Sequence, residues 1–493
     1  MSKIVDMRGF LATSIVVASA AALALPTTLP AAAATASGRG PVAGAATTAE
    51  QAAEPGTRSV PLVPLTRDRV LGTAPEQGLP ARDVRHFSLL GVVWDSPRTE
   101  LLGRVQVRTR TAASGAWSGW QDLETHNSEH GADPGTAEGG SARVRGATAP
   151  LWVGDSDGVE VRVRAAGADE AAADGEHGDG ARPRTAADGT VTLPTGLRLA
   201  LVDPGRDPSV PRTAPGDRAD GTPVEAPPAG APDTGALPAG ALDAATSAAS
   251  AANSDVAALG ATEIGALDRA ATEAELLTVR AGQLTDEQRV KPHIGPRPRI
   301  VTRRGWGANE KLREKKFGYT KTVKAAFVHH TATGNTYRCS QAPSVIRSIY
   351  SYHVKSMGWR DIGYNFVVDK CGTIYEGRAG GVTKPVMGAH TLGFNSNSTG
   401  IAVLGTFGNS KPPAAAVRAI ARLVAWKIGL YGGNPKGKTY LRSGGGNLYR
   451  KGKNVRLNVI SGHRDGFLTE CPGRQLYGKL GTARSTAAYY QGR

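Results

Sequence analysis

Histidine and cysteine side chains at two distant places in the chain could hold a metal ion. An apolar run that starts at Ala325 ends in His329 and His330, and His463 and Cys471 lie eight residues apart further on. Imidazole and thiolate are ligands that Zn²⁺ prefers, and three protein ligands leave one position for water, as at a catalytic zinc. No fourth Cys or His lies close enough in sequence to close such a site. This pattern therefore favours a catalytic zinc over a structural one.

Spacing alone is weak evidence, because ten histidines in 493 residues place two of them near a cysteine fairly often by chance. A cysteine hydrolase built on Cys471 and His463 is an alternative. However, Cys471 precedes Pro472 and Gly473 and does not open a predicted helix that could lower its thiol pKa.

The sequence around these residues predicts the elements that position them. Apolar runs and helical periodicity indicate strands over 324–331 and 400–406, a hairpin of 364–368 with 373–376, and helices over 343–357 and 412–429. Alternating strands and helices are typical of an α/β domain, which we place at 293–493.

The preceding residues predict a different organisation. Residues 81–205 carry short period-two runs such as Val105 with Val107, separated by Gly and Pro, and favour a small all-β, sandwich-like domain. Its four tryptophans favour core positions, with an exposed sugar-binding platform as the alternative. Residues 37–80 are predicted to be disordered. Residues 206–292 are rich in Ala, Pro and Gly and are interpreted as a linker, with a possible helix over 257–279, that lets the two domains move separately.

The N-terminus reads as an export signal over residues 1–36. Lys3 and Arg8 precede an apolar stretch that is followed by small-residue cleavage sites. A membrane anchor is the alternative, but the apolar core of about 16 residues is short of the ~20 that span a bilayer. We therefore expect a secreted protein without a stable membrane anchor.

Charge is distributed unevenly along the chain. The net charge is +16, and residues 301–493 hold 31 Lys/Arg against 7 Asp/Glu, or +24, which leaves −8 for residues 1–300. A basic surface steers a protein to polyanions. Export argues against nucleic acid, whereas anionic wall polymers fit the compartment; a basic face that serves only solubility is the alternative.

The three cysteines bear on the same compartment. If Cys471 binds zinc, Cys339 and Cys371 remain as a candidate disulfide, which an oxidising environment permits. Two buried free thiols are the alternative.

Five motifs share one resemblance, which covers about the last 195 residues. In order they are Thr302–Ala308 (TRRGWGA), Gly358–Phe366 (GWRDIGYNF), Ile374–Arg378 (IYEGR), Gly388–His390 (GAH) and Asn397–Val403 (NSTGIAV). Together with the histidines and Cys471, they resemble the zinc amidase family that includes phage-lysozyme-type N-acetylmuramoyl-L-alanine amidases and peptidoglycan recognition proteins.

The resemblance implies a mixed β-sheet flanked by helices and one Zn²⁺ held by His329, His463 and Cys471. The implied reaction is hydrolysis of the amide between N-acetylmuramic acid and L-alanine in peptidoglycan. Tyr364 matches the tyrosine that lies near the zinc in this family. The alternative is that Tyr364 is a core residue at the start of a strand.

Thr469 stands where some phage members have a lysine and recognition proteins a threonine, so the general base stays open. Four further residues are candidate substrate contacts: His353, Arg378, His390 and Asn395. For His353, packing against its own helix is an equal alternative. A binding-only recognition module, which in this family accompanies loss of a zinc ligand, is the second functional class. Here all three ligands and the tyrosine are present.

Overall fold

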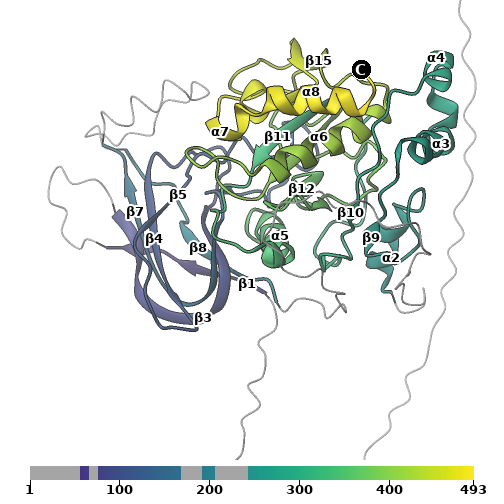
Figure 1. The fold of residues 1–493 in the computed structure, drawn as a ribbon. Coiled ribbons are helices and arrows are strands. Elements are labelled where there is room, and N and C mark those ends of the chain that lie inside the picture. Colours follow the sequence, from purple (N-terminus) through teal and green to yellow (C-terminus); the bar gives the residue numbers. More distant parts are fainter. Residues whose placement is uncertain (1–55, 66–75, 168–190, 206–241) are drawn as a thin grey trace, which may run out of the picture. The chain divides into compact units, whose positions relative to one another are not determined.

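The computed structural model describes residues 56–65, 76–167, 191–205 and 242–493 (Figure 1). The predicted export signal, much of the stretch 37–80 and the first part of the predicted linker lie outside these residues. Residues 54–493 belong to one compact unit. Among the described residues, none of the helices has the length and apolar character needed to cross a membrane.

The N-terminal part is all β, as predicted. Its strands form one antiparallel sheet with the order β1-β8-β3-β7-β4-β5, and β2 and β6 also pair with β3. Alternate residues such as Val105 and Val107 point into its core, with Phe87 and Leu199. The strands span Gly56–Pro61 (β1), Val63–Pro64 (β2), Glu76–Trp94 (β3), Gly103–Thr111 (β4), Gln121–Leu123 (β5), Gly146–Ala147 (β6), Leu151–Ala165 (β7) and Arg198–Asp203 (β8). β1 and β2 lie inside the stretch 37–80 that was predicted to be disordered. β1 pairs with β8 and β2 pairs with β3 through their backbones, and the few large apolar side chains of this stretch did not indicate this pairing.

The four tryptophans of this domain divide between core and surface. Trp94 and Trp152 are buried, whereas Trp117 is 37% exposed. Arg108 lies over the rings of both Trp117 and Trp120. The core interpretation therefore holds for two of the four.

The C-terminal part contains the predicted mixed sheet, with the order β17-β11-β14-β12-β13-β10-β9. β11 is parallel to both β14 and β17, and β14 is parallel to β12. The strands span Glu263–Ile264 (β9), Ile300–Val301 (β10), Ala325–His330 (β11), Phe366–Val368 (β12), Ile374–Glu376 (β13), Ser398–Val403 (β14) and Ile460–Gly462 (β17). Lys438–Arg442 (β15) and Asn454–Asn458 (β16) form a separate antiparallel hairpin.

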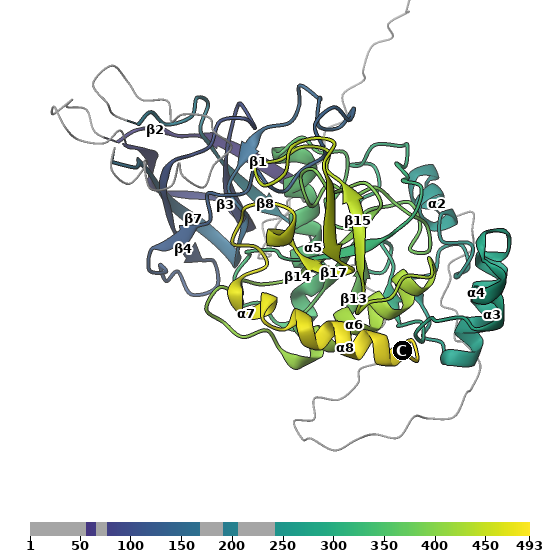
Figure 2. The same cartoon turned by 90° about the horizontal axis from the view of Figure 1, so that it is seen from above.

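Helices cover both faces of this sheet (Figure 1, Figure 2). On one face, α6 (Ala414–Gly429) and α8 (Leu480–Tyr490) lie side by side and pack on Ala326 and Val328 of β11. On the other face, α5 (Ala342–Ser351) continues into a π-helical segment, η4 (Tyr352–Ser356), and packs on Val367 and Ala402. A short helix, α7 (Arg474–Tyr477), precedes α8. The alternation of β11 thus turns His329 away from α6.

Residues 242–292 are ordered elements within the stretch interpreted as a linker. They form α2 (Ala244–Ala251), β9, α3 (Arg269–Val279) and α4 (Asp286–Val290). Asp243, Asp268 and Thr285 cap the three helices through their side chains. Ile264 and Leu276 are buried in the core under α6. An Ala-rich composition hides these few anchoring side chains.

The two domains share a core, which differs from the expectation that they move separately. Leu89, Val93 and Trp152 of the β-domain cluster with Ile346 and Ile349 of α5. Backbone contacts join them as well, since Trp152 N donates to Thr333 O at 3.1 Å. Apolar burial of this kind holds domains together.

Candidate metal centre

Two parallel strands bring the first two predicted ligands together. Val328 of β11 pairs with Gly462 of β17, so His329 and His463 follow at the same end of neighbouring strands. Their ring centroids are 4.5 Å apart. The chain then returns so that Cys471 Sγ lies 3.8 Å from His329 Nδ1. All three predicted ligands are buried and adjacent.

A fourth candidate ligand, His130, comes from the β-domain. It lies in the segment 124–145 between β5 and β6, called here the β5–β6 loop. The ligand atoms of His130, His329, His463 and Cys471 all lie within 4.8 Å of one another. The sequence argument missed His130 because it searched only near the other ligands along the chain.

The chemistry of this cluster fits a metal ion. Both ring nitrogens of His130 and of His463 are buried without a hydrogen-bond partner in the protein, which is rare for buried polar atoms. Burial lowers the pKa of His130 to about 3 and lowers the pKa of His329 and His463 well below the usual value, helped by neighbouring imidazoles. The imidazoles are therefore neutral, as metal ligands must be. Burial also raises the pKa of the Cys471 thiol, which a bound cation would oppose.

His390, predicted to contact substrate, instead lies behind the first ligand. Its Nδ1 shares a 3.2 Å hydrogen bond with His329 Nε2, and its side chain is fully buried. With His329 Nδ1 facing Cys471, the Nε2–H can donate to His390 and fix the ring orientation. We therefore assign His390 to positioning of His329.

Tyr364 lies against the cluster, where its ring centroid is 5.5 Å from that of His329 and 5.9 Å from that of His130. Burial raises the pKa of Tyr364 well above the usual value, so its hydroxyl keeps its proton. Tyr364 also lines a cavity beside Cys471.

Thr469 lies in the turn that carries the thiolate ligand. Its Oγ1 accepts from Cys471 N at 3.1 Å and donates to Glu129 Oε1 at 2.8 Å. Burial raises the pKa of Glu129 to about 8. Thr469 thus shapes the turn and at the same time contacts the β5–β6 loop.

The other predicted substrate contacts are occupied by protein groups. His353 is buried against Trp359, with ring centroids 4.4 Å apart, and its Nδ1 accepts from Gly363 N. Arg378 donates to both carboxylate oxygens of Glu138, at 2.9 and 2.8 Å. Asn395 Nδ2 donates to Asp133 Oδ1 at 2.7 Å. His353 therefore contacts residues that follow its helical segment, and it also lines the cavity beside Cys471.

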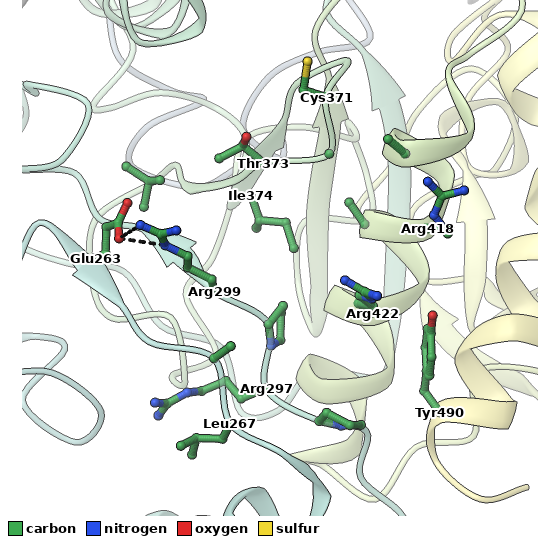
Figure 3. Close-up of a pocket in the computed structure, with 17 residues that line it drawn as sticks. Glu263, Leu267, Arg297, Arg299, Cys371, Thr373, Ile374, Arg418, Arg422 and Tyr490 are labelled. Atoms are coloured by element: carbon green, nitrogen blue, oxygen red, sulfur yellow. Dashed lines mark hydrogen bonds and ion pairs between the residues drawn. The ribbon is translucent and has the colours of Figure 1, made fainter. Parts of the chain in front are cut away.

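Two cavities of different character lie in this part of the chain. One of about 310 Å³ opens beside Cys471, His130 and Tyr364 and has Glu100 and Glu124 among its lining residues. The other, of about 620 Å³, is lined by Cys371 of the disulfide but by none of the predicted metal-ligating, catalytic or substrate-binding residues, and it is rich in arginine (Figure 3). Chemistry, rather than size, assigns the candidate site to the smaller cavity.

The predicted disulfide is present between Cys339 and Cys371, with Cα atoms 6.2 Å apart. It joins the start of the α5 segment to the turn between β12 and β13. Cys471 is the free cysteine among the described residues.

Comparison with known proteins places both halves of the chain. Residues 319–474 match the N-acetylmuramoyl-L-alanine amidase family, and residues 41–187 match the family described as Rv3811 N-terminal galactose-binding domain-like. Peptidoglycan-recognition protein SC2 of Drosophila simulans is 31% identical over 185 residues, which are 37% of this chain and 85% of that protein. Peptidoglycan-recognition protein 1 of Holotrichia diomphalia is 37% identical over 187 residues, covering 37% of this chain and 79% of that protein. The solved complex of peptidoglycan recognition protein-LE with tracheal cytotoxin is 32% identical, covers 37% of this chain and 92% of that chain, and has a TM-score of 0.29.

The mixed sheet, its cluster of histidines with one cysteine, and these relatives define a domain of the amidase type. Through this domain the chain belongs to the family of N-acetylmuramoyl-L-alanine amidases and peptidoglycan recognition proteins, as its motifs predicted.

Proposed function

We propose that this chain is a secreted, zinc-dependent hydrolase that cleaves the amide bond between N-acetylmuramic acid and the L-alanine of the peptidoglycan stem peptide. The observation that carries the proposal is the meeting of His329, His463 and Cys471, with unpartnered imidazole nitrogens, beside Tyr364. Membership of the family supports peptidoglycan as the substrate class.

A zinc ion held by these three residues would lower the pKa of a bound water toward 7 and polarise the scissile carbonyl. The protein contributes the remaining functions. His390 holds the ring of His329, and Thr469 holds the turn that presents Cys471. The Tyr364 hydroxyl, which keeps its proton, can donate to the oxygen on which negative charge develops.

Two other functions compete with this proposal. A binding-only recognition module needs no metal, yet this chain keeps all three predicted ligands buried and adjacent. A cysteine hydrolase needs an accessible thiolate, whereas Cys471 is buried, burial raises its pKa, and it lies outside the first turn of α7. The first alternative predicts wall binding without cleavage, and the second predicts cleavage that does not depend on a metal.

Mass spectrometry of purified wall digested by the full chain tests the proposal. Cleavage should release stem peptides with a free L-alanine amino group, and a chelator should abolish that release. Cys471→Ser should bind less zinc and lose activity. The variant Asp133→Ala with Glu138→Ala releases the β5–β6 loop from the amidase domain. If neither this variant nor the wild-type chain yields these peptides, the proposal is wrong.

A further inference from the structure

The β5–β6 loop brings a histidine to a metal centre that already has three protein ligands. His130 lies with its ring centroid 4.6 Å from that of His463 and 5.4 Å from that of His329. Its side chain is only 9% exposed, and Glu129 Oε1 lies 3.7 Å from its Nδ1 without a hydrogen bond between them. Burial of an imidazole with both nitrogens unbonded is unfavourable. A metal ion shared with the other three ligands would satisfy one of them.

We propose that His130 is a fourth protein ligand of the zinc, and that the β5–β6 loop thereby holds the enzyme in a closed resting form. The inference rests on the proposed function. Four protein ligands are the arrangement of structural zinc sites, whereas a catalytic zinc keeps one position open for water. His130 occupies the position that the reaction requires.

Carboxylates of the same loop hold it on the amidase domain. Glu138 makes a two-pronged ion pair with Arg378, and Asp133 Oδ1 accepts from Gly393 N at 2.8 Å as well as from Asn395. These carboxylates are buried, where paired charges hold their geometry.

Backbone contacts extend the same attachment on both sides of His130. Leu392 N donates to Glu129 O at 3.0 Å, and Arg145 N donates to Met357 O at 3.0 Å. The loop also passes directly over Gly358, where an added Cβ would lie 2.0 Å from Arg143 O. The loop is therefore fixed at several points and does not merely approach the site.

The attachment covers residues that the sequence predicted to bind substrate. Arg378 and Asn395 both donate to loop carboxylates, and the cavity that remains beside the metal cluster measures about 310 Å³. That volume is at the lower end for a small-molecule pocket. A glycan strand with its stem peptide therefore requires the loop to move, and this movement takes His130 from the metal.

Cobalt substitution of the full chain tests the inference through a readout other than activity. The visible absorption of Co²⁺ reports the number and type of its ligands. His130→Ala should change this spectrum and weaken Co²⁺ binding, measured by competition with a chelator, on the order of 10-fold or more. Azide should shift the spectrum of His130→Ala and not that of the wild type. His86→Ala, which removes an exposed histidine of the same domain, should match the wild type in all three measurements.

A second variant keeps the test valid if His130→Ala folds poorly. Asp133→Ala with Glu138→Ala retains His130 but removes the two carboxylates that hold the loop, and it should respond to azide and cleave soluble muropeptide faster than the wild type. Unchanged spectra and affinities in both variants would overturn the inference. If His130→Ala cleaves more slowly but binds Co²⁺ as the wild type does, His130 is not a metal ligand and instead transfers a proton in the reaction. If Cys471→Ser binds Co²⁺ as tightly as the wild type, the zinc site of the proposed function itself fails.

Discussion

Tyr364 is the residue on which charge stabilisation in the proposed reaction depends. Tyr364→Phe removes the hydroxyl and leaves the ring that packs against His329 and His353. Loss of one preorganised donor typically lowers turnover on the order of 10²-fold. We expect this fall in the rate of muropeptide cleavage, measured in both the wild-type and His130→Ala backgrounds, with the zinc content unchanged. An unaltered rate would reduce Tyr364 to a core residue.

The two adjacent histidines at the end of β11 should differ sharply in their effect on metal binding. Side chains alternate along a strand, so His329 faces the cluster, whereas His330 Nδ1 accepts from Phe407 N on the other side. His329→Ala should lose most of the bound zinc, and His330→Gln should keep about one zinc per chain. Elemental analysis after dialysis checks both. Equal zinc loss in the two variants would show that the assignment of His329 is wrong.

The sequence allowed prediction of some of these residues and not of others, for physical reasons. The apolar run of β11 contains His329, and a motif after β17 contains His463 and Cys471, so these residues could be found from the sequence. His130 follows no periodic run, and it reaches the cluster only through packing between domains. His390 was visible as part of a motif, but its hydrogen bond with His329 becomes visible only in the tertiary structure.

At the scale of elements, strong periodicity predicted the sheet and helices around the site well. The expected strand 324–331 is β11, and the expected helix 412–429 is α6. Within residues 242–292, α3 lies inside the helix predicted over 257–279. α2 and α4 escaped prediction, because alanine in α2 provides little contrast between faces and α4 has only five residues. The stability of these three helices comes from caps and from a few buried anchors such as Leu276, which sequence periodicity does not reveal.

The disulfide between Cys339 and Cys371 links the start of the α5 segment to the turn between β12 and β13, across a sequence separation of 32 residues. Closing a loop of this length restricts the unfolded chain, and the entropy estimate for its removal is roughly 3 to 4 kcal/mol. Cys339→Ser with Cys371→Ser should lower the free energy of unfolding by about that amount, measured by urea unfolding of the full chain. Metal content should persist, because neither cysteine belongs to the cluster. Equal unfolding curves for this variant and the wild type would contradict a stabilising role.

At the scale of the whole molecule, the contact between the domains changes the role of the predicted linker. Tyr352 Oη donates to Thr148 O at 3.0 Å, and an added Cβ at Gly91 would lie 2.3 Å from that hydroxyl. Such close packing couples the β-domain to the segment that follows α5. The N-terminal domain therefore packs directly against the domain that carries the candidate metal centre, as the proposed role of the β5–β6 loop requires.

Charge belongs to the same scale, and we propose that it guides the protein to anionic wall polymers. The arginine-rich cavity of about 620 Å³ carries Arg297, which pairs with Glu275, and Arg299, which pairs with Glu263. Figure 3 shows the second of these pairs. Arg418 and Arg422 on α6 have no ion pair among the described residues and are exposed. These two side chains are thus available to a polyanion.

Sedimentation of the full chain with whole wall should therefore depend on salt and on these two arginines. Near 0.5 M salt the screening length falls to roughly 4 Å, so sedimentation should weaken sharply, while cleavage of a small soluble muropeptide should change little. At low salt, Arg418→Ala with Arg422→Ala should weaken sedimentation more than Arg82→Ala with Arg85→Ala, which removes the same charge from the β-domain. Equal losses would mean that net charge alone attracts the wall. A larger loss of sedimentation in the β-domain variant would show that the β-domain targets the protein to the wall. In that domain, Trp117 and Trp120 lie beside arginines.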